Sequence, residues 1–300
     1  MRIGIDLGGT KIEIVALDEA GTITLRSRQP TPREDYGSIV RTLTTMVRDA
    51  EAQLGAQATV GIGTPGAVSA ATGRIKNSNT TCLIGQPLRE DLGQALQREI
   101  RLENDANCFA LSEAADGAAA GADVVFGVIV GTGTGGGLVI HGRPLAGRNA
   151  IGGEWGHNPL PWPRDDERPG PACYCGLHGC IETFLSGPGL ERDHVAHGHQ
   201  AQPAAAIARA AESGDAAAQA TLERYADRMA RGLASIINVV DPDVIVMGGG
   251  VSNIEWLYSA VPERWGQWVF SDRVDTRLVR AAHGDSSGVR GAAWLWPAKG

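Results

Sequence analysis

Three cysteines stand close together in the chain, as Cys173-x-Cys175-x₄-Cys180. Thiolates at this spacing in a glycine-rich polar loop are typical of a zinc site, which needs four tetrahedral ligands. His157 and His178 are the candidates for the fourth. We favour His157, because a closed shell is easier to build from separate loops and His178 lies inside the tight Cys175–Cys180 segment. A Cys₃His shell leaves no open coordination position, so the zinc is expected to be structural.

Three glycine turns each follow an apolar, strand-like run: Asp6–Lys11, Gly131–Gly136 and Gly248–Gly250. Glycines let the backbone approach phosphate closely, and Asp6 at the end of a strand can orient a water on Mg²⁺. Each turn alone could be a plain hairpin, but three together favour a nucleotide site. The residues predicted to bind Mg-ATP are Asp6, Gly8, Gly9, Thr10, Lys11, Thr132, Gly133, Thr134, Gly135, Gly249 and Gly250.

Two common nucleotide motifs do not fit these turns. The first turn joins two strands, whereas a Walker A loop leads from a strand into a helix. The second formally contains G-x-G-x-x-G, but the strand-like Leu138–Ile140 follows it where a dinucleotide site has a helix.

Asn104-Asp105 lies between a strand-like segment and an alanine-rich helical one. Asn and Asp are preferred N-caps, so a purely structural role is one interpretation. The other is that Asp105 accepts the proton of an attacking hydroxyl in phosphoryl transfer. Glu154 and Glu182 flank the cysteine loop together with His157. A carboxylate can accept hydrogen bonds from neighbouring hydroxyls, so this group suits a polyol such as a sugar.

These residues must be positioned by strands and helices whose periodicity the sequence shows. Strand patterns are predicted at 2–7, 11–17, 22–28, 59–62, 100–102, 124–130, 138–140, 244–247 and 278–280, and helices at 35–54, 88–99, 104–119, 203–238 with a break near Gly214, and 288–296. Strand, glycine turn and strand occur twice, at 2–17 and 124–140, which indicates two related α/β domains. The charged segment Arg164–Arg168 is expected to be a solvated loop.

The chain has 300 residues and a net charge of −7, which argues against nucleic acid as a partner. No apolar stretch approaches the length of a membrane span, and Asp6 interrupts the first apolar run, so no signal peptide is expected. We therefore expect a cytoplasmic protein, in which clustered thiols bind metal rather than form disulfides.

The segments Asp6–Lys11, Gly131–Gly137, Glu154-Trp155-Gly156-His157 and Cys173–Glu182 together resemble the ROK family of repressors, open reading frames and kinases. Asp6–Lys11 alone is similar to the first phosphate loop of the actin, hexokinase and Hsp70 ATPases. The resemblance implies an α/β fold of two actin-like, ribonuclease H-like ATPase domains with an active-site cleft between them and a zinc loop at 157–180. The implied domains are 1–108 plus 288–300, and 109–287.

The resemblance also implies roles for residues. Asp105 would be the general base, and the sugar contacts would be Asn79, Asn104, Asp105, Glu154, His157 and Glu182. His157 would bind zinc through one ring nitrogen and offer the other to the sugar. Such enzymes are commonly homodimers that close on their substrate.

Within the family the chain looks most similar to bacterial fructokinases, on the segments Glu154–Trp162 and His283–Pro297. The expected reaction is ATP-dependent phosphorylation of fructose, with mannose as a second acceptor. Glucokinase and N-acetylhexosamine kinase are the alternatives within the family. A sugar-sensing regulator is the rival from another class, but the first strand starts at residue 2 and leaves no room for a helix-turn-helix ahead of it. An actin-like assembly or chaperone module would leave the zinc loop without a purpose.

Overall fold

The structure is a computed structural model that describes residues 1–33, 35–78 and 80–297. It contains two compact units. The first comprises Met1–Gly121, Gly137–Gly152 and the chain from Asp285 on, and the second comprises Ala122–Gly136 and Gly153–Gly284. The boundary implied by the family resemblance, after residue 108, falls inside a continuous helix, and hydrogen bonds along that helix keep it in one unit.

The first unit is built on a mixed five-stranded sheet with the order β3-β2-β1-β4-β7. Its strands are β1 (Arg2–Leu7), β2 (Lys11–Leu17), β3 (Ile23–Pro30), β4 (Thr59–Thr64) and β7 (Ile100–Asn104). Strands β1, β2 and β3 pair antiparallel, whereas β4 pairs parallel with both β1 and β7. The carboxyl ends of β1 and β7 therefore point the same way, which brings the Asp6 turn and Asn104 to one edge of the sheet.

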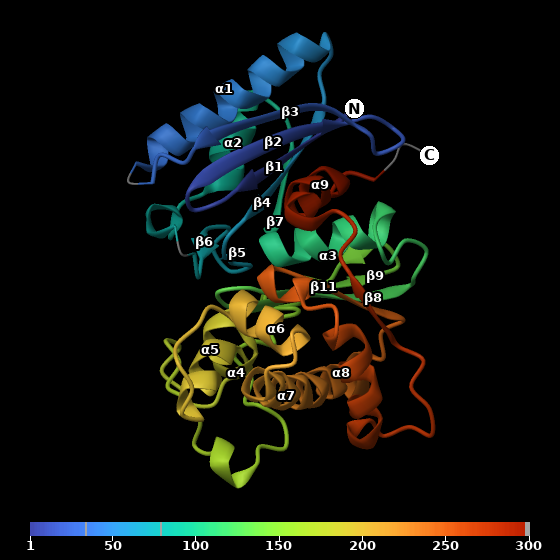
Figure 1. The fold of residues 1–300 in the computed structure, drawn as a ribbon. Coiled ribbons are helices and arrows are strands. Elements are labelled where there is room, and N and C mark those ends of the chain that lie inside the picture. The colour runs from blue at the N-terminus through green and yellow to red at the C-terminus, as the bar shows by residue number, and fades with distance from the viewer. Residues whose placement is uncertain (34, 79, 298–300) are drawn as a thin grey trace. The chain divides into compact units, whose positions relative to one another are not determined.

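Both faces of this sheet are covered by helices. The helices of the first unit are α1 (Tyr36–Leu54), α2 (Leu88–Leu96), α3 (Asp105–Asp116) and α9 (Ser287–Trp294). Alternate side chains of β2 explain the arrangement: Ile12 and Ile14 join the core that includes α1, whereas Val15 packs against Val289 of α9. Figure 1 shows α1 and α2 on one face of the sheet and α9 on the other.

Two further antiparallel ladders involve the first unit, and the second belongs to the sheet with the order β10-β9-β8-β11-β12. Strands β5 (Ala67–Val68) and β6 (Ile75–Lys76) form a short antiparallel ladder. Strand β9 (Thr134–Ile140) begins in the second unit and ends in the first, where it pairs antiparallel with β10 (Arg143–Pro144). Strand β9 starts at Thr134 rather than at the predicted Leu138, because Thr134–Gly137 is extended despite its three glycines.

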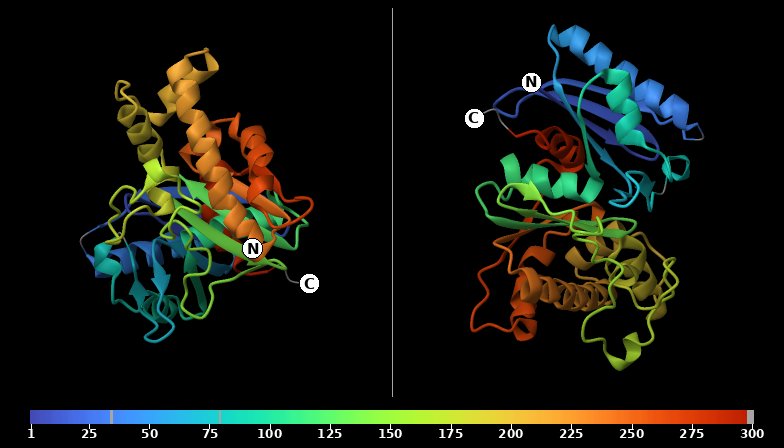
Figure 2. Two further views of the ribbon diagram at one scale, coloured as in Figure 1. Left: turned by 90° about the horizontal axis from the view of Figure 1, so that it is seen from below. Right: turned by 180° about the vertical axis from the view of Figure 1, so that it is seen from behind.

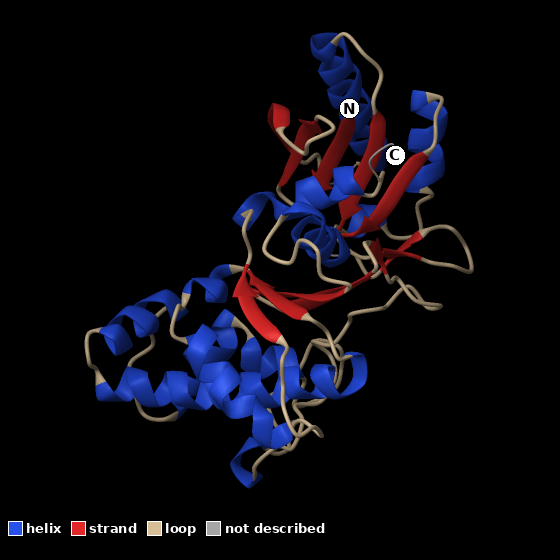
Figure 3. Ribbon diagram, turned by 90° about the vertical axis from the view of Figure 1, so that its right-hand side faces the viewer, coloured by secondary structure: helices blue, strands red, loops and turns tan. Residues whose placement is uncertain are grey.

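The second unit contains the buried strands β8 (Val124–Val130) and β11 (Val244–Gly248) and the more exposed strand β12 (Arg277–Arg280), with β11 parallel to both others. Its helices are α4 (Ile181–Leu185), α5 (Gly187–Ala196), α6 (Ala204–Glu212), α7 (Ala216–Val240) and α8 (Leu257–Trp265). Short 3₁₀ turns lie in the second unit at Asp165–Glu167 (η2), Gly250–Asn253 (η3) and Gly266–Trp268 (η4). Another lies in the first unit at Thr81–Leu83, and the turn Gly284–Ser286 lies where the chain passes from the second unit into the first. Figure 3 shows these helices gathered beside the strands of the unit. The left view of Figure 2 shows the long helix α7 from the side.

Helix boundaries follow their caps. Asp35, predicted as the first helical residue, is instead the N-cap of α1 and accepts hydrogen bonds from the N–H groups of Gly37 and Ser38. Helix α1 ends at Gly55, which has a φ of 64°. The predicted break near Gly214 is confirmed, because α6 ends at Glu212 and Asp215 caps α7.

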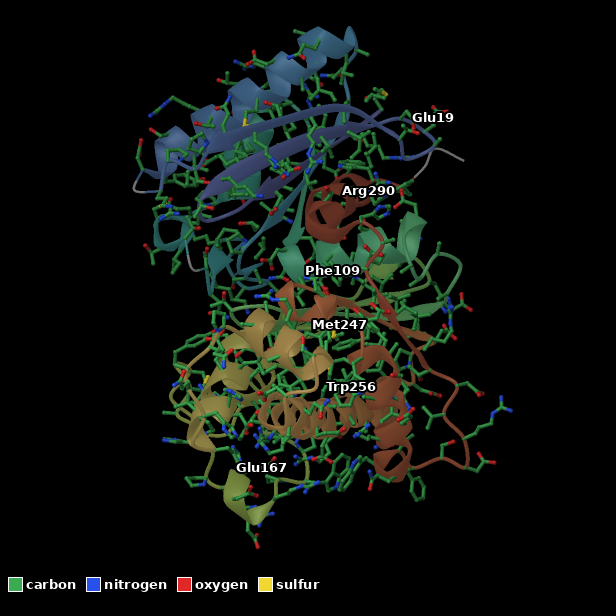
Figure 4. The ribbon with its side chains drawn as sticks, in the orientation of Figure 1. Glu19, Phe109, Glu167, Met247, Trp256 and Arg290 are labelled. Atoms are coloured by element: carbon green, nitrogen blue, oxygen red, sulfur yellow. The ribbon has the colours of Figure 1, made fainter. Side chains whose placement is uncertain are left out.

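The prediction of a solvated loop at Arg164–Arg168 is wrong for Glu167, which is 6% exposed. The Glu167 carboxylate accepts hydrogen bonds from Arg228 at 2.7 Å and from Arg231 at 2.8 and 2.7 Å. These arginines hold the pKa of Glu167 down at about 2, despite its burial. One residue of the charged segment, Glu167, therefore forms buried ion pairs with Arg228 and Arg231 of α7. Figure 4 labels Glu167 in the loop beside that helix. Charge patterning alone does not reveal which member of a run finds buried partners.

Among the residues that the structure describes, no helix is long and apolar enough to cross a membrane.

Candidate functional site

The Asp6–Lys11 turn is a tight, braced hairpin in the first unit. The N–H of Gly8 donates to the carbonyl of Lys11 at 3.0 Å. Thr31 braces the turn twice: its hydroxyl donates to the Gly8 carbonyl at 2.7 Å, and its N–H donates to the Thr10 carbonyl at 3.0 Å. Thr31 was not predicted from the sequence, since only the pairing of β2 with β3 brings it beside the turn. Thr10 and Lys11 are exposed and available to a ligand.

Asp6 and Asp105 act on each other within the first unit. The pKa of Asp6 is raised to about 6, first by burial and then by the neighbouring carboxylates of Asp105 and Glu13, whereas Lys11 lowers it. A carboxylate pair of this kind favours binding of a cation or a proton, because either relieves the repulsion. The chemistry matches an Mg²⁺-dependent phosphoryl transfer, in which Asp6 would hold a metal-bound water.

Asn104 is the N-cap of α3, which agrees with the structural one of the two interpretations of Asn104-Asp105. Its side-chain oxygen accepts from the N–H of Ala106 at 2.8 Å, and its amide donates to the carbonyl of Gly66 at 3.0 Å. Asp105 follows as the first helical residue and is exposed, with one carboxylate oxygen 2.8 Å from the same Ala106 N–H. The cap therefore fixes Asp105 at the helix N-terminus, where the helix dipole favours a carboxylate. Asn79 lies outside the described residues.

The second glycine turn, Gly131–Gly136, is anchored inside the second unit. The N–H of Gly131 donates to the Gly133 carbonyl at 2.9 Å, and the indole of Trp155 donates to the Gly135 carbonyl at 3.1 Å. The N–H of Thr134 donates to Oε2 of Glu182 at 2.9 Å. Glu182, predicted only as a sugar contact, is thus also bonded to the predicted phosphate turn.

The third glycine turn follows β11. Gly249 has a φ of 84°, and a Cβ at this position would collide with the carbonyl of Val130, so only glycine fits. The hydroxyl of Ser252 closes the turn by donating to the Gly249 carbonyl at 2.7 Å. A 3₁₀ turn, η3, follows. A cavity of about 370 Å³ lies beside it, lined by Ala208, Ala211, Glu212, Gln219, Leu222, Glu223, Ile254 and Trp256; Figure 4 labels Trp256.

The cysteine loop and His157 form the predicted four-ligand group. One ligand atom from each of His157, Cys173, Cys175 and Cys180 lies within 4.8 Å of all the others. Cys175 Sγ is 3.6 Å from Cys180 Sγ, and Cys173 Sγ is 3.5 Å from His157 Nδ1. A tetrahedral zinc with bonds of about 2.3 Å separates two sulfurs by about 3.8 Å, so the donor set fits the metal. His178 does not belong to this group, and the choice of His157 agrees with the geometry.

Main-chain pairing explains how distant residues reach the cysteines. The N–H of Ile181 donates to the Asn158 carbonyl and that of Glu182 donates to the Gly156 carbonyl, both at 2.8 Å. His157 therefore lies on a segment that runs beside Cys180. Glu154, on the same segment, is exposed.

The second nitrogen of His157 contacts a tyrosine that was not predicted from the sequence. His157 Nε2 lies 2.9 Å from the hydroxyl of Tyr174, and the two rings meet edge to face at 5.0 Å. Desolvation raises the pKa of Tyr174, and the nearby charges of Glu182, Cys173 and Glu154 raise it further. Its position directly between Cys173 and Cys175 was the available signal, since a residue with a ligand on each side lies close to the metal group.

The chain is similar to known proteins over nearly its whole length. The chain is 42% identical to an N-acetyl-D-glucosamine kinase of Pectobacterium atrosepticum over 299 residues, which cover 98% of each chain. It is 40% identical to the enzyme of that name from Escherichia coli O157:H7, covering 98% of this chain and 99% of the other. The crystal structure of a ROK hexokinase from Thermus thermophilus superposes with a TM-score of 0.85 at 35% identity, covering 98% and 96%. The model of the ROK family matches residues 2–299, and the chain belongs to the ROK family.

Proposed function

We propose that this protein is an ATP-dependent kinase for N-acetyl-D-glucosamine, which transfers the γ-phosphoryl group of ATP to a sugar hydroxyl. The observation that carries the proposal is the identity of 40 to 42% over nearly the whole chain with relatives of that name. The sequence patterns favoured fructose, whereas these relatives are named for N-acetyl-D-glucosamine. The N-acetylhexosamine alternative is therefore the better supported of the two.

In this proposal the first unit supplies the acid–base and metal chemistry. Asp105 takes the proton of the attacking sugar hydroxyl. The hydroxyl oxygen forms the new bond to the γ-phosphorus while the bond from that phosphorus to ADP breaks and ADP leaves. Asp6 holds a water of the Mg²⁺ that neutralises the phosphates. The turn of Gly8, Gly9 and Thr10 provides main-chain donors at the phosphates, and Lys11 adds positive charge.

The second unit is proposed to bind the rest of both substrates. Glu154 and Glu182 contact the sugar directly, and His157, whose Nε2 lies 2.9 Å from the Tyr174 hydroxyl, acts through that tyrosine. The turn from Thr132 to Gly135 binds phosphate, and the Thr134 hydroxyl is buried without a hydrogen-bond partner among the described residues, so it is a donor that a ligand at this turn could use. Zinc at the cysteine group holds the loop that carries His157, and the closed shell gives it no catalytic position.

The base of ATP is proposed to lie in the 370 Å³ cavity that Ile254 and Trp256 line just after the third glycine turn, because its wall of alanines, Leu222, Ile254 and Trp256 suits an aromatic ring. A larger side chain in this wall, as in Ala208→Leu, should raise the KM for ATP with little effect on the KM for the sugar.

We also propose a cytoplasmic homodimer. The cytoplasm supplies ATP and keeps thiolates reduced for zinc. Two exposed apolar residues of the second unit, Val239 and Phe270, support association, and we call them the apolar patch. They are 84% and 101% exposed, and the N–H of Phe270 donates a hydrogen bond of 2.8 Å to Oδ1 of Asn238, the neighbour of Val239 on α7. Large exposed apolar side chains on a fixed backbone are typical of interfaces.

A steady-state panel with Mg-ATP tests the function. N-acetylglucosamine, N-acetylmannosamine, glucose, mannose and fructose are compared by ADP release. We expect the highest kcat/KM for N-acetylglucosamine. A higher value for fructose would restore the sequence-based expectation, and no sugar-dependent ADP release would remove the kinase proposal altogether.

A further inference from the structure

Tyr174 is placed where it can act on a substrate but is almost unsupported by the protein. Its side chain lies beside His157 in the cysteine loop, yet the residue is 84% exposed. The described contacts that hold it are the hydrogen bond of 2.9 Å to His157 Nε2 and the edge-to-face ring contact. Each of these two interactions is weak by itself, so the ring can change its position at low cost.

The ligand set determines the direction of the hydrogen bond. His157 turns Nδ1 toward Cys173 Sγ, so Nδ1 is the nitrogen that faces zinc. A neutral imidazole bound through Nδ1 carries its proton on Nε2, and Nε2–H therefore donates to the Tyr174 oxygen. The Tyr174 hydroxyl has then accepted one bond and keeps its own proton to donate elsewhere.

Hydrogen-bond chemistry separates the roles of the proposed sugar contacts in the second unit. The carboxylates of Glu154 and Glu182 only accept, so they suit sugar hydroxyl groups. An acetamido carbonyl also only accepts, and no carboxylate can bind it. The Nε2–H of His157 is already used by Tyr174. Among these four side chains, the Tyr174 hydroxyl is the one with a proton left for a carbonyl.

We propose that Tyr174 is the specificity-determining residue for the N-acetyl group, donating its hydroxyl proton to the acetamido carbonyl of the sugar. The inference rests on the proposed function, since it assigns a contact within that site. The exposed ring face would also pack against the acetyl methyl group. A plain hexose has a hydroxyl in place of the acetamido group, so it gains less from this donor.

The test is Tyr174→Phe, which removes the hydroxyl and keeps the ring, with Leu177→Ala as control, because Leu177 is an exposed side chain of the same loop. Zinc content is confirmed at one per chain in both variants. Calorimetric titration without ATP measures the Kd of N-acetylglucosamine and of glucose. Tyr174→Phe should weaken N-acetylglucosamine binding about 5- to 10-fold and glucose binding less than 2-fold. Leu177→Ala should change neither.

A second measurement follows zinc transfer to a coloured chelator. Loss of the acceptor on His157 should speed zinc release about 10-fold in Tyr174→Phe. Faster zinc release with unchanged sugar binding would leave Tyr174 a structural role only and overturn the inference. Equal weakening for both sugars would overturn it too, since the acetyl group would not be the target.

The wild-type protein separates this inference from the proposed function. If it prefers another sugar but Tyr174→Phe still loses N-acetylglucosamine selectively, the function is wrong and the role of Tyr174 stands. If it prefers N-acetylglucosamine and the variant binds it equally well, the function stands and the role is wrong. Wild-type protein without measurable N-acetylglucosamine binding would overturn both.

Discussion

The main-chain N–H of Thr134 donates a 2.9 Å hydrogen bond to Oε2 of Glu182. One end of this bond belongs to the proposed phosphate turn and the other to a proposed sugar contact. A substitution at Glu182 is therefore expected to weaken the binding of both ATP and the sugar. Glu154 has no described hydrogen bond to the turn, so a substitution there should affect the sugar alone.

We predict that Glu182→Gln raises the KM for both ATP and N-acetylglucosamine, each about 10-fold, because a charge-assisted hydrogen bond is replaced by a neutral one. The matched variant Glu154→Gln should raise the KM for the sugar alone. Steady-state kinetics with each substrate varied in turn distinguishes the two. An ATP KM that is unchanged in Glu182→Gln would show that the bond to Thr134 does not matter for nucleotide binding.

Asp105→Asn should lower kcat at least about 100-fold with little change in either KM, because it removes the proton acceptor and keeps the shape of the helix start. Asn104→Ala provides the contrast. It removes the N-cap of α3 and should destabilise the fold by about 1 kcal/mol, seen in urea unfolding. Near-normal turnover of Asp105→Asn at saturating sugar would refute its assignment as the base.

The raised pKa of Asp6, about 6, predicts a pH-dependent stability. The folded state holds this proton more tightly than an ordinary Asp with a pKa of 3.8, so the contribution to stability is present at low pH and is lost as the pH rises through 6. Asp6→Asn should therefore stabilise the ligand-free protein by at most about 3 kcal/mol above pH 7 and by much less near pH 4.

Urea unfolding of Asp6→Asn and wild type from pH 4 to 8, without Mg²⁺ or nucleotide, measures this difference. Glu19→Gln, an exposed carboxyl in the same unit, is the control and should show no such trend. A difference that does not change with pH would mean that Asp6 is ionised at an ordinary pKa.

His157→Ala should abolish zinc binding, whereas His178→Ala should keep one zinc per chain, because only His157 lies within the four-ligand group. Metal analysis of the purified proteins decides this. Loss of zinc should also lower the thermal midpoint, since structural zinc contributes folding free energy. Equal zinc loss from both variants would contradict the Cys₃His shell.

Phe270→Asp should shift the protein from dimer to monomer in sedimentation velocity, because a charge replaces the most exposed aromatic ring of the apolar patch. Because the Phe270 side chain is exposed, its replacement removes no packing within the chain. The thermal midpoint of the variant should therefore fall below that of the wild type only by the contribution of the lost subunit contact. A wild-type protein that sediments as a monomer would remove the dimer proposal.

Local features of this protein were predictable from its sequence because they depend on neighbouring residues. The strands at 2–7, 11–17 and 124–130, the break at Gly214 and the three glycine turns all arise from periodicity and backbone freedom. The cysteine spacing by itself likewise indicated a metal site. A helix cap at Asn104 was one of the two interpretations drawn from the sequence, since the preference of Asn for a helix start is intrinsic.

Tertiary structure decided what depends on residues far apart in the chain. Glu167 belongs to a charged run, and only the packing of α7 turned it into a buried partner of Arg228 and Arg231. Glu182 reached Thr134, and Tyr174 reached His157, through pairing of segments that are separated in sequence. Burial and long-range hydrogen bonds are properties of the folded chain, and a linear pattern of residue types does not contain them.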